Sequence, residues 1–150
     1  MRLTRLYRCA VAVLGLVALA AGAAGCANNT ISTPSDLVAY SQADLRVGTG
    51  ADVVSGSVVT VNYTGWFYDA SVADHRGVMF TTSLGQTTPL QITVGTGQVI
   101  QGWDQGLVGM KEGGLRRLVI PPSMGYGGVR YGVIPPYTTL VFDVEAVAVQ

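Results

Sequence analysis

The chain has 150 residues, of which only 12% are charged and 20 are glycine, a composition typical of a turn-rich β protein rather than a disordered one. Basic and acidic residues balance at nine each, but Arg2, Arg5 and Arg8 precede an apolar run, and without them six basic and nine acidic residues leave a net charge of −3. A mildly acidic domain gives no electrostatic reason to expect nucleic-acid binding.

The first 25 residues have the anatomy of a signal peptide. Residues 1–8 are basic, residues 10–21 are an apolar run of Ala, Val and Leu, and small residues follow up to Gly25. The apolar run is short for a stable transmembrane span and ends in small residues. We therefore expect residues 1–25 to direct export.

Cys26 follows at a position that resembles the lipidated cysteine of bacterial lipoproteins. Because Cys9 lies in the signal peptide, the mature chain would carry one cysteine and form no internal disulfide. Lipidation explains this odd thiol and predicts a protein held on the outer face of the bacterial cytoplasmic membrane, within the cell envelope. Ala23 departs from the branched residue preferred three positions earlier. A plain secretory signal with a free Cys26, and hence a secreted protein, is the alternative.

Residues 26–44 are polar, rich in Ser and Thr, and without strong periodicity. Such a composition is typical of a flexible linker. We expect it to be a lipid-anchored tether that lets a domain at residues 45–150 stand off the membrane.

Within this domain, alternating apolar and polar residues predict several strands. They are expected at residues 45–47, 58–63 with continuation to 68, 78–82, 90–94, 115–120 and 139–149. Polar residues 69–77 form a loop, and residues 123–136 form a long loop rich in Gly and Tyr. In the last strand, period two turns four side chains inward: Leu140, Phe142, Val144 and Ala146.

One short helix is expected between residues 94 and 115. Val99, Ile100, Trp103, Leu107 and Met110 are spaced by one, three, four and three residues. This spacing places apolar side chains on one face of a helix of two or three turns, although ordinary core residues have the same spacing. A lone helix against a twisted sheet indicates an α+β domain with a single core.

Several common chemistries lack their residues. His75 is the only histidine, and with one mature cysteine the usual zinc ligands cannot be assembled. Gly95-Thr96-Gly97 lacks the third glycine of a dinucleotide-binding loop, and neither a phosphate-binding loop nor a Gly-x-Ser-x-Gly elbow occurs. We expect no metal and no cofactor.

Four motifs in order resemble the FKBP-type peptidyl-prolyl isomerases. They are Val59-Thr-Val-Asn-Tyr-Thr-Gly-Trp66, Val99-Ile-Gln-Gly-Trp-Asp104, Tyr126-Gly127, and the run from Val133 to Glu145. The resemblance covers residues 45–150, and the loop over residues 68–77 matches a longer form found among bacterial members. It implies the FKBP fold, a twisted antiparallel β-sheet wrapped around one short α-helix.

The resemblance also implies an apolar, aromatic pocket. Trp103 would be its floor, and the Tyr126 hydroxyl and the Ile100 amide would be hydrogen-bond donors. The implied catalytic residues are Tyr63, Phe80, Val99, Ile100, Trp103, Tyr126 and Phe142, and the implied further substrate-binding residues are Leu90, Thr81 and Ile134. Two positions depart from the family: Leu90 stands where Phe is usual, and Thr81 stands where an aspartate usually follows the pocket phenylalanine.

Such a pocket suits the rotation of an X–Pro bond, whose barrier of roughly 18–20 kcal/mol arises from amide resonance and needs no nucleophile. The resemblance therefore implies a prolyl cis-trans isomerase acting on exported proteins. A binding module or chaperone that holds proline-containing segments with little catalysis is the alternative. The implied partners are proline-containing polypeptides, macrolides such as tacrolimus or rapamycin, and a membrane through the lipid anchor.

Overall fold

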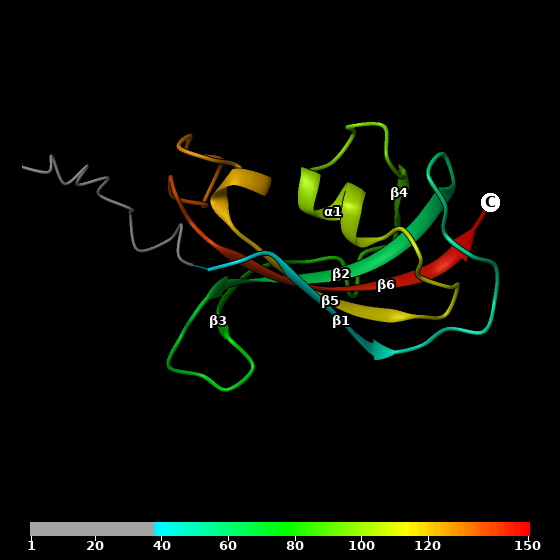
Figure 1. The fold of residues 1–150 in the computed structure, drawn as a ribbon, viewed down its shortest axis with the longest axis horizontal. Helices are drawn as coiled ribbons and strands as arrows, with labels where there is room; N and C mark the ends of the chain where they lie inside the picture. The colour runs from blue at the N-terminus through cyan, green and yellow to red at the C-terminus, as the bar shows by residue number, and fades with distance from the viewer. Residues whose placement is uncertain (1–37) are drawn as a thin grey trace, which may run out of the picture. The chain divides into compact units, whose positions relative to one another are not determined.

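The computed structural model describes residues 38–150, so the predicted signal peptide, Cys26 and most of the predicted tether lie outside the described residues. Figure 1 shows the described part as a curved sheet with one short helix against it. The elements in chain order are β1 (Ser41–Arg46), β2 (Val58–Tyr68), β3 (Arg76–Thr82), β4 (Leu90–Thr93), α1 (Gln101–Gly106), β5 (Leu115–Ile120), the 3-10 turn η2 (Pro122–Met124) and β6 (Leu140–Val149).

The sheet has the strand order β1-β5-β6-β2-β3, and β4 pairs with the first part of β2. All its pairs are antiparallel. The helix α1 lies on one face, above β2 and β6 (Figure 1). This arrangement confirms the predicted fold class.

Alternation along the central strands explains why the core lies between the sheet and α1. Val59 and Val61 on β2 are fully buried, as are Leu140 and Val144 on β6. Val141 is buried as well, although it points to the other face, where its cross-strand neighbours are Val119 and Trp66. The outer face of the sheet is therefore partly covered, which strict alternation did not predict.

The strand predicted at residues 45–47 is wrong in its bounds, because β1 begins at Ser41 and ends at Arg46. The last residues of the predicted tether thus belong to the sheet. All six residues of β1 are exposed, so no burial pattern marks the strand in the sequence. Its place comes from pairing with β5 and from a buried arginine there: Arg116 bonds both carboxylate oxygens of Asp44.

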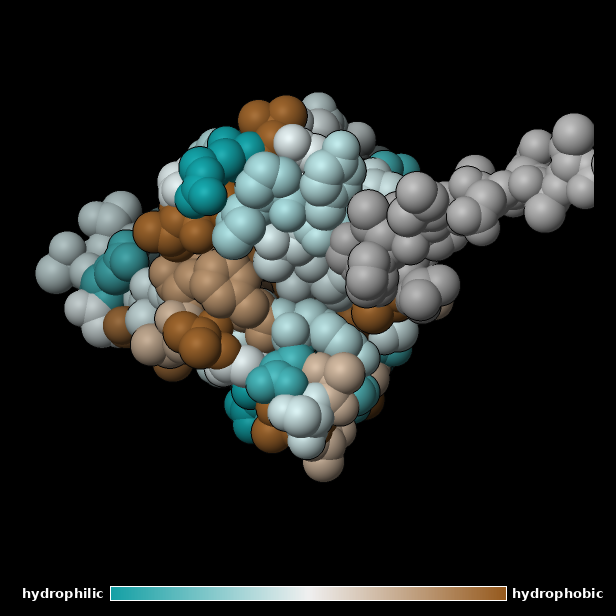
Figure 2. Space-filling view, turned by 90° about the vertical axis from the view of Figure 1, so that its left-hand side faces the viewer, coloured by the Kyte–Doolittle hydropathy of each residue, from teal (hydrophilic) through white to brown (hydrophobic). Residues whose placement is uncertain are grey.

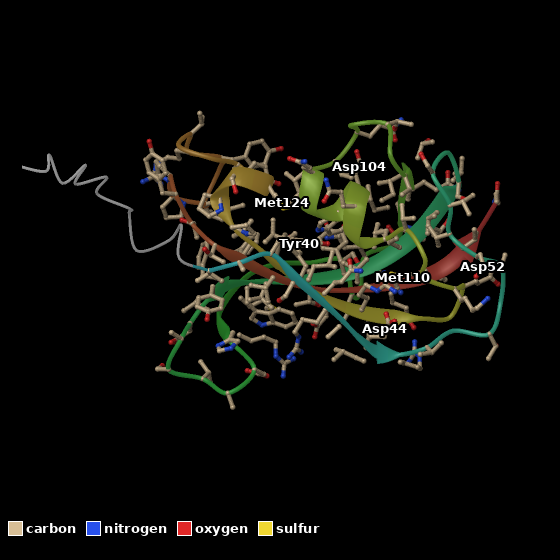
Figure 3. The ribbon with its side chains drawn as sticks, in the orientation of Figure 1. Tyr40, Asp44, Asp52, Asp104, Met110 and Met124 are labelled. Carbon is tan, nitrogen blue, oxygen red and sulfur yellow. The ribbon has the colours of Figure 1, made fainter. Side chains whose placement is uncertain are left out.

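The same Arg116 connects β1 to the helix, because its guanidinium also donates to the carbonyls of Gly106 and Val108 at the end of α1. A cation at this end complements the helix dipole. Directly before β1, the Tyr40 hydroxyl donates to the Gly102 carbonyl at 3.1 Å (Figure 3). The first described residues therefore brace the helix that carries Trp103.

The helix is shorter than predicted: α1 spans six residues, Val99 and Ile100 precede it, and Met110 lies beyond it. Gly109 takes the left-handed conformation, with φ of 79°, soon after the helix ends. The apolar side chains still meet in the core, with Trp103 only 4% exposed.

β3 begins two residues earlier than predicted, at Arg76, and shortens the preceding loop.

The two glycines of α1 set how closely the helix packs on β5. A Cβ atom on Gly102 would lie 2.7 Å from the Ile120 side chain, and one on Gly106 would lie 2.5 Å from Leu118. Only glycine fits at such separations.

Within residues 38–150, the structure contains no helix of the length and apolarity that a bilayer crossing requires.

Candidate functional site

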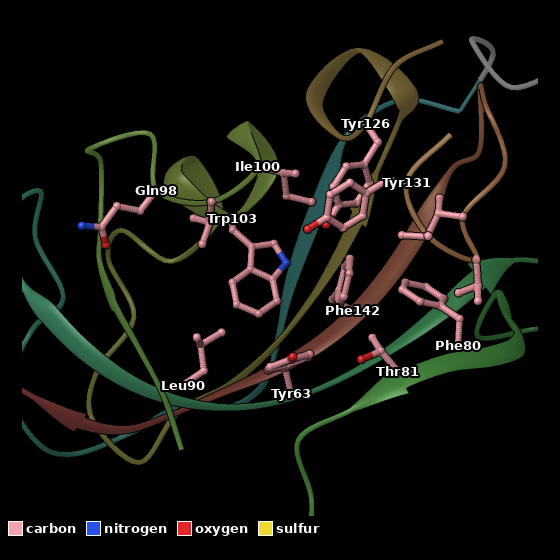
Figure 4. Close-up of a pocket in the computed structure, with 14 residues that line it drawn as sticks. Tyr63, Phe80, Thr81, Leu90, Gln98, Ile100, Trp103, Tyr126, Tyr131 and Phe142 are labelled. Carbon is pink, nitrogen blue, oxygen red and sulfur yellow. The ribbon is translucent and has the colours of Figure 1, made fainter. Parts of the chain in front are cut away.

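A cavity of about 600 Å³ lies between the sheet, α1 and the loop that follows η2 (Figure 4). It brings together all ten residues that the resemblance implied for the pocket. Its full lining is Tyr63, Phe80, Thr81, Leu90, Gln98, Val99, Ile100, Trp103, Tyr126, Tyr131, Gly132, Val133, Ile134 and Phe142. Gln98, Tyr131, Gly132 and Val133 were not expected from the sequence. They lie in loops, where no periodicity indicates which side chains turn inward.

Three rings meet edge to face at the bottom of the cavity. The Trp103 ring centroid lies 5.2 Å from that of Tyr63 at an interplanar angle of 76°, and 5.3 Å from that of Phe142 at 88°. Phe80 meets Phe142 in the same manner at 5.7 Å. Edge-to-face pairs are favourable beyond the area that they bury, by about 0.5–1.5 kcal/mol each. The cluster therefore forms a preorganised apolar floor.

The indole of Trp103 has a buried Nε1 atom with no hydrogen-bond partner in the described part of the chain. Leaving a buried donor unpaired costs about 1–3 kcal/mol. In Figure 4 this nitrogen lies on the side of the indole that faces Phe142 and Tyr126. The site thus keeps a donor that no protein acceptor occupies.

Two further donors lie at the cavity. The Ile100 amide, which directly precedes α1, has no acceptor among residues 38–150. The Tyr126 ring stacks on Tyr131 with centroids 4.4 Å apart. Burial raises the pKa of Tyr126 above its ordinary value, and the nearby Tyr131 and Tyr63 raise it further, so its hydroxyl keeps its proton at neutral pH.

A carboxylate in the first turn of α1 holds the segment that leads to Ile100. Asp104 accepts hydrogen bonds from the amides of Gly95 at 2.9 Å and Gly97 at 2.7 Å. Both glycines have positive φ values, 79° and 74°, which glycine adopts without strain. The Gln98 side chain accepts from the Thr93 amide at 2.9 Å. These bonds fix the approach of the chain to the cavity.

Comparison with known proteins identifies the family. Residues 50–147 match the family model described as FKBP-type peptidyl-prolyl cis-trans isomerase. The chain belongs to this family. It is thus an FKBP-type isomerase by descent, and the motifs quoted above fall within the matched residues.

Relatives and solved structures agree with this assignment. An FK506-binding protein of Neisseria meningitidis serogroup B is 50% identical over 107 residues, which are 71% of this chain and 92% of that protein. An FK506-binding protein of Streptomyces anulatus is 43% identical over 118 residues, 77% of this chain and 88% of that protein. The crystal structure of AtFKBP13 superposes with a TM-score of 0.59 at 32% identity and covers 73% of this chain and 91% of that one. The crystal structure of FkpA from Escherichia coli superposes with a TM-score of 0.61 at 36% identity, and the match covers 74% of this chain and 48% of that one.

Two lining positions distinguish this FKBP cavity. Thr81 pairs with Gly65 of β2. A Cβ atom added to Gly65 would come within 2.9 Å of the side chains of Phe80, Phe142 and Thr81. No residue that lines the described cavity is acidic. Leu90 remains 37% exposed at the rim, a smaller wall than an aromatic ring would make.

No set of three metal-ligating side chains gathers anywhere in residues 38–150. His75 lies outside the cavity of the FKBP domain, in the loop before β3, where its ring stacks on Tyr68 with centroids 4.8 Å apart. It is half-buried and takes a left-handed backbone conformation with φ of 57°. Its contacts are those of a loop residue packed on its neighbour.

Proposed function

We propose that the aromatic cavity binds X–Pro segments of exported proteins and accelerates their cis-trans isomerisation. The observation that carries this proposal is the edge-to-face cluster of Trp103, Tyr63 and Phe142, with unpaired donors from Tyr126 and Ile100 beside it. The family membership supports the reaction class.

The chemistry follows from the electronic structure of the amide. A planar amide is more charge-separated than a twisted one, so an apolar site disfavours the ground state relative to the transition state. The apolar floor accommodates the proline ring. The Ile100 amide and the Tyr126 hydroxyl bind carbonyl oxygens of the client and hold it while the bond rotates. No metal, nucleophile or proton transfer is needed in this scheme.

The same cavity would take macrolides such as tacrolimus or rapamycin, as the name of the FK506-binding relatives suggests. A macrolide that uses a carboxylate at the cavity edge would bind less tightly here, because Thr81 offers only a neutral hydroxyl. Charge-assisted hydrogen bonds are roughly twice as strong as neutral ones.

A peptide isomerisation assay coupled to a protease tests the function. The chain should accelerate the conversion, and Tyr126→Phe should lower kcat/KM about three- to tenfold, since one hydrogen bond is worth about 0.5–1.5 kcal/mol. Tyr137→Phe, an exposed tyrosine outside the cavity, is the matched control and should keep full activity. Binding of proline peptides without acceleration would favour the binding-module alternative instead.

We further propose that the domain works outside the cytoplasm, anchored through a lipid on Cys26 and connected by the residues before β1. The support is the order of basic, apolar and small residues before Cys26 and the single cysteine of the mature chain. Unfolded exported chains would then meet the isomerase as they leave the membrane.

A further inference from the structure

A second groove, of about 580 Å³, lies beside the aromatic cavity. Its walls include Val38, Phe67, Tyr68, Gly77, Val78 and Thr138. Phe67 and Val78 give it an apolar lining, and Val78 is 73% exposed. None of the residues that line this groove also lines the aromatic cavity.

The groove and the cavity share a wall. Phe67 of the groove and Phe80 of the cavity stack with ring centroids 4.9 Å apart at 24°. The strand β3 supplies Gly77 and Val78 to the groove and Phe80 and Thr81 to the cavity. Because a strand rises about 3.3 Å per residue, Val78 and Thr81 lie about 10 Å apart along β3. An extended polypeptide covers this distance in about three residues.

The strand between the two sites has an open edge. In the described sheet, β3 is the last strand and pairs with β2 alone. It exposes Val78 and also Met79, which is 55% accessible. Figure 2 views the end of the molecule where β3 lies and shows hydrophobic surface gathered there. Open, apolar strand edges are sites where another chain can add in extended form.

We propose that this groove is a second client subsite, which takes a large apolar side chain about three residues from the proline while the residues between them extend along β3. The inference rests on the proposed function, since it is the client held in the cavity that brings its neighbouring residues to β3.

The groove disfavours an acidic side chain. Asp69 stands in its wall, and hydrogen bonds from the Ser71 hydroxyl and amide hold the pKa of that carboxyl below its ordinary value. Asp69 is therefore anionic at neutral pH and repels an acidic side chain. Tyr68, fixed by its stack on His75, completes a wall suited to an apolar or aromatic group.

The test compares peptides on the full chain. One is a four-residue X–Pro peptide that reaches only the cavity. The others are ten-residue peptides with Phe, Gly or Glu at the third residue before or after the proline. Phe should lower KM about tenfold relative to Gly in one of the two series, because burying most of an aromatic side chain favours binding to that extent. Glu should give no gain.

Variants on opposite edges of the sheet provide the control. Val78→Asp should abolish the gain from Phe and leave the four-residue peptide unaffected. Val47→Asp, equally exposed at 71% but next to β1, should keep the gain. A gain that persists in Val78→Asp, or no gain in either series, would overturn the inference. Absence of activity on the four-residue peptide would instead contradict the proposed function.

The test also distinguishes a client from the chain's own residues before Val38, because Val38 in the groove wall is where the described residues begin. If Val78→Asp makes the bonds before Val38 sensitive to protease in the absence of peptide, the chain itself fills the groove. That result would also overturn the inference.

Discussion

Thr81 is the lining residue whose chemistry departs furthest from the family pattern. Its side chain lines the cavity. A carboxylate at the same place would accept hydrogen bonds with a full negative charge. The apolar floor is complete without it, since Trp103, Tyr63 and Phe142 contact one another directly. We therefore infer a working isomerase of reduced activity.

Thr81→Asp should raise kcat/KM about tenfold and tighten tacrolimus binding by a similar factor, because restoring charge-assisted bonds contributes on the order of 1–2 kcal/mol. The coupled isomerisation assay and a tacrolimus titration measure the two effects. Thr82→Asp, one residue along the strand and outside the cavity lining, is the control and should bring no gain. Parent activity equal to that of typical family members, unchanged in Thr81→Asp, would show that the carboxylate does not matter here.

Among the elements, β1 and α1 depend on each other through Arg116. This guanidinium is 7% exposed and joins Asp44 of β1 to the carbonyls at the end of α1. Because α1 carries Trp103, the brace also supports the floor of the cavity. An edge strand with no buried side chain is thus held by the ion pairs of Asp44 with Arg116 and of Arg46 with Glu145, and by its pairing with β5.

The ion pair predicts a dependence of stability on pH. The hydrogen bond from Arg116 lowers the pKa of Asp44, and burial opposes this shift. A lowered pKa stabilises the fold above the unfolded-state value of about 3.9, and this contribution is lost as the pH falls through the folded-state pKa. Asp44→Asn should therefore reduce the free energy of unfolding at pH 7 and have less effect near pH 3.

The expected loss at pH 7 is about 1 kcal/mol or less, because the Asp44 side chain is 40% exposed and solvent screens the pair. Urea denaturation at both pH values measures it. Asp52→Asn removes a carboxylate that pairs with the exposed Lys111 and serves as the control, with a smaller expected change. An equal loss at pH 7 and pH 3 would argue that Asp44 acts through something other than its charge.

At the scale of the whole molecule, the described residues form one sheet and one α-helix, with the aromatic cavity and the second groove at the β3 side and the Arg116 brace at the β1 side. Within residues 38–150 no helix is long and apolar enough to cross a membrane. The anchor that we propose, a lipid on Cys26, lies in the residues before β1.

Cys26→Ala should release the protein from the membrane fraction of the bacterial cell into the soluble fraction, because the thiol that would carry the lipid is gone. Fractionation and immunodetection of parent and variant provide the measurement. Ala27→Ser, the adjacent conservative change, is the control and should behave as the parent does. A variant that stays with the membrane like the parent would contradict lipid anchoring.

Patterns local in the chain were enough to predict much of the fold. The bounds of the strand at residues 115–120 agree with β5, and the predicted continuation to residue 68 agrees with β2. Val59, Val61, Leu140 and Val144 turn inward because one-sided burial leaves a period of two in the sequence. The family resemblance carried by the four motifs likewise implied the ten side chains that line one cavity.

Structural features that depend on contacts between residues remote in sequence left no pattern in the sequence from which they could be predicted. β1 buries none of its residues and is placed by Arg116, more than 70 positions away in the chain. The close packing of α1 on β5 depends on Gly102 and Gly106 meeting side chains of that strand, and the rim residues Gln98 and Tyr131 come from loops without periodicity. The groove behind Phe67 exists only because β3 is an open edge beside the end of β2. Local periodicity records burial on one face, whereas edges, close approaches and loop closures arise when segments remote in sequence meet.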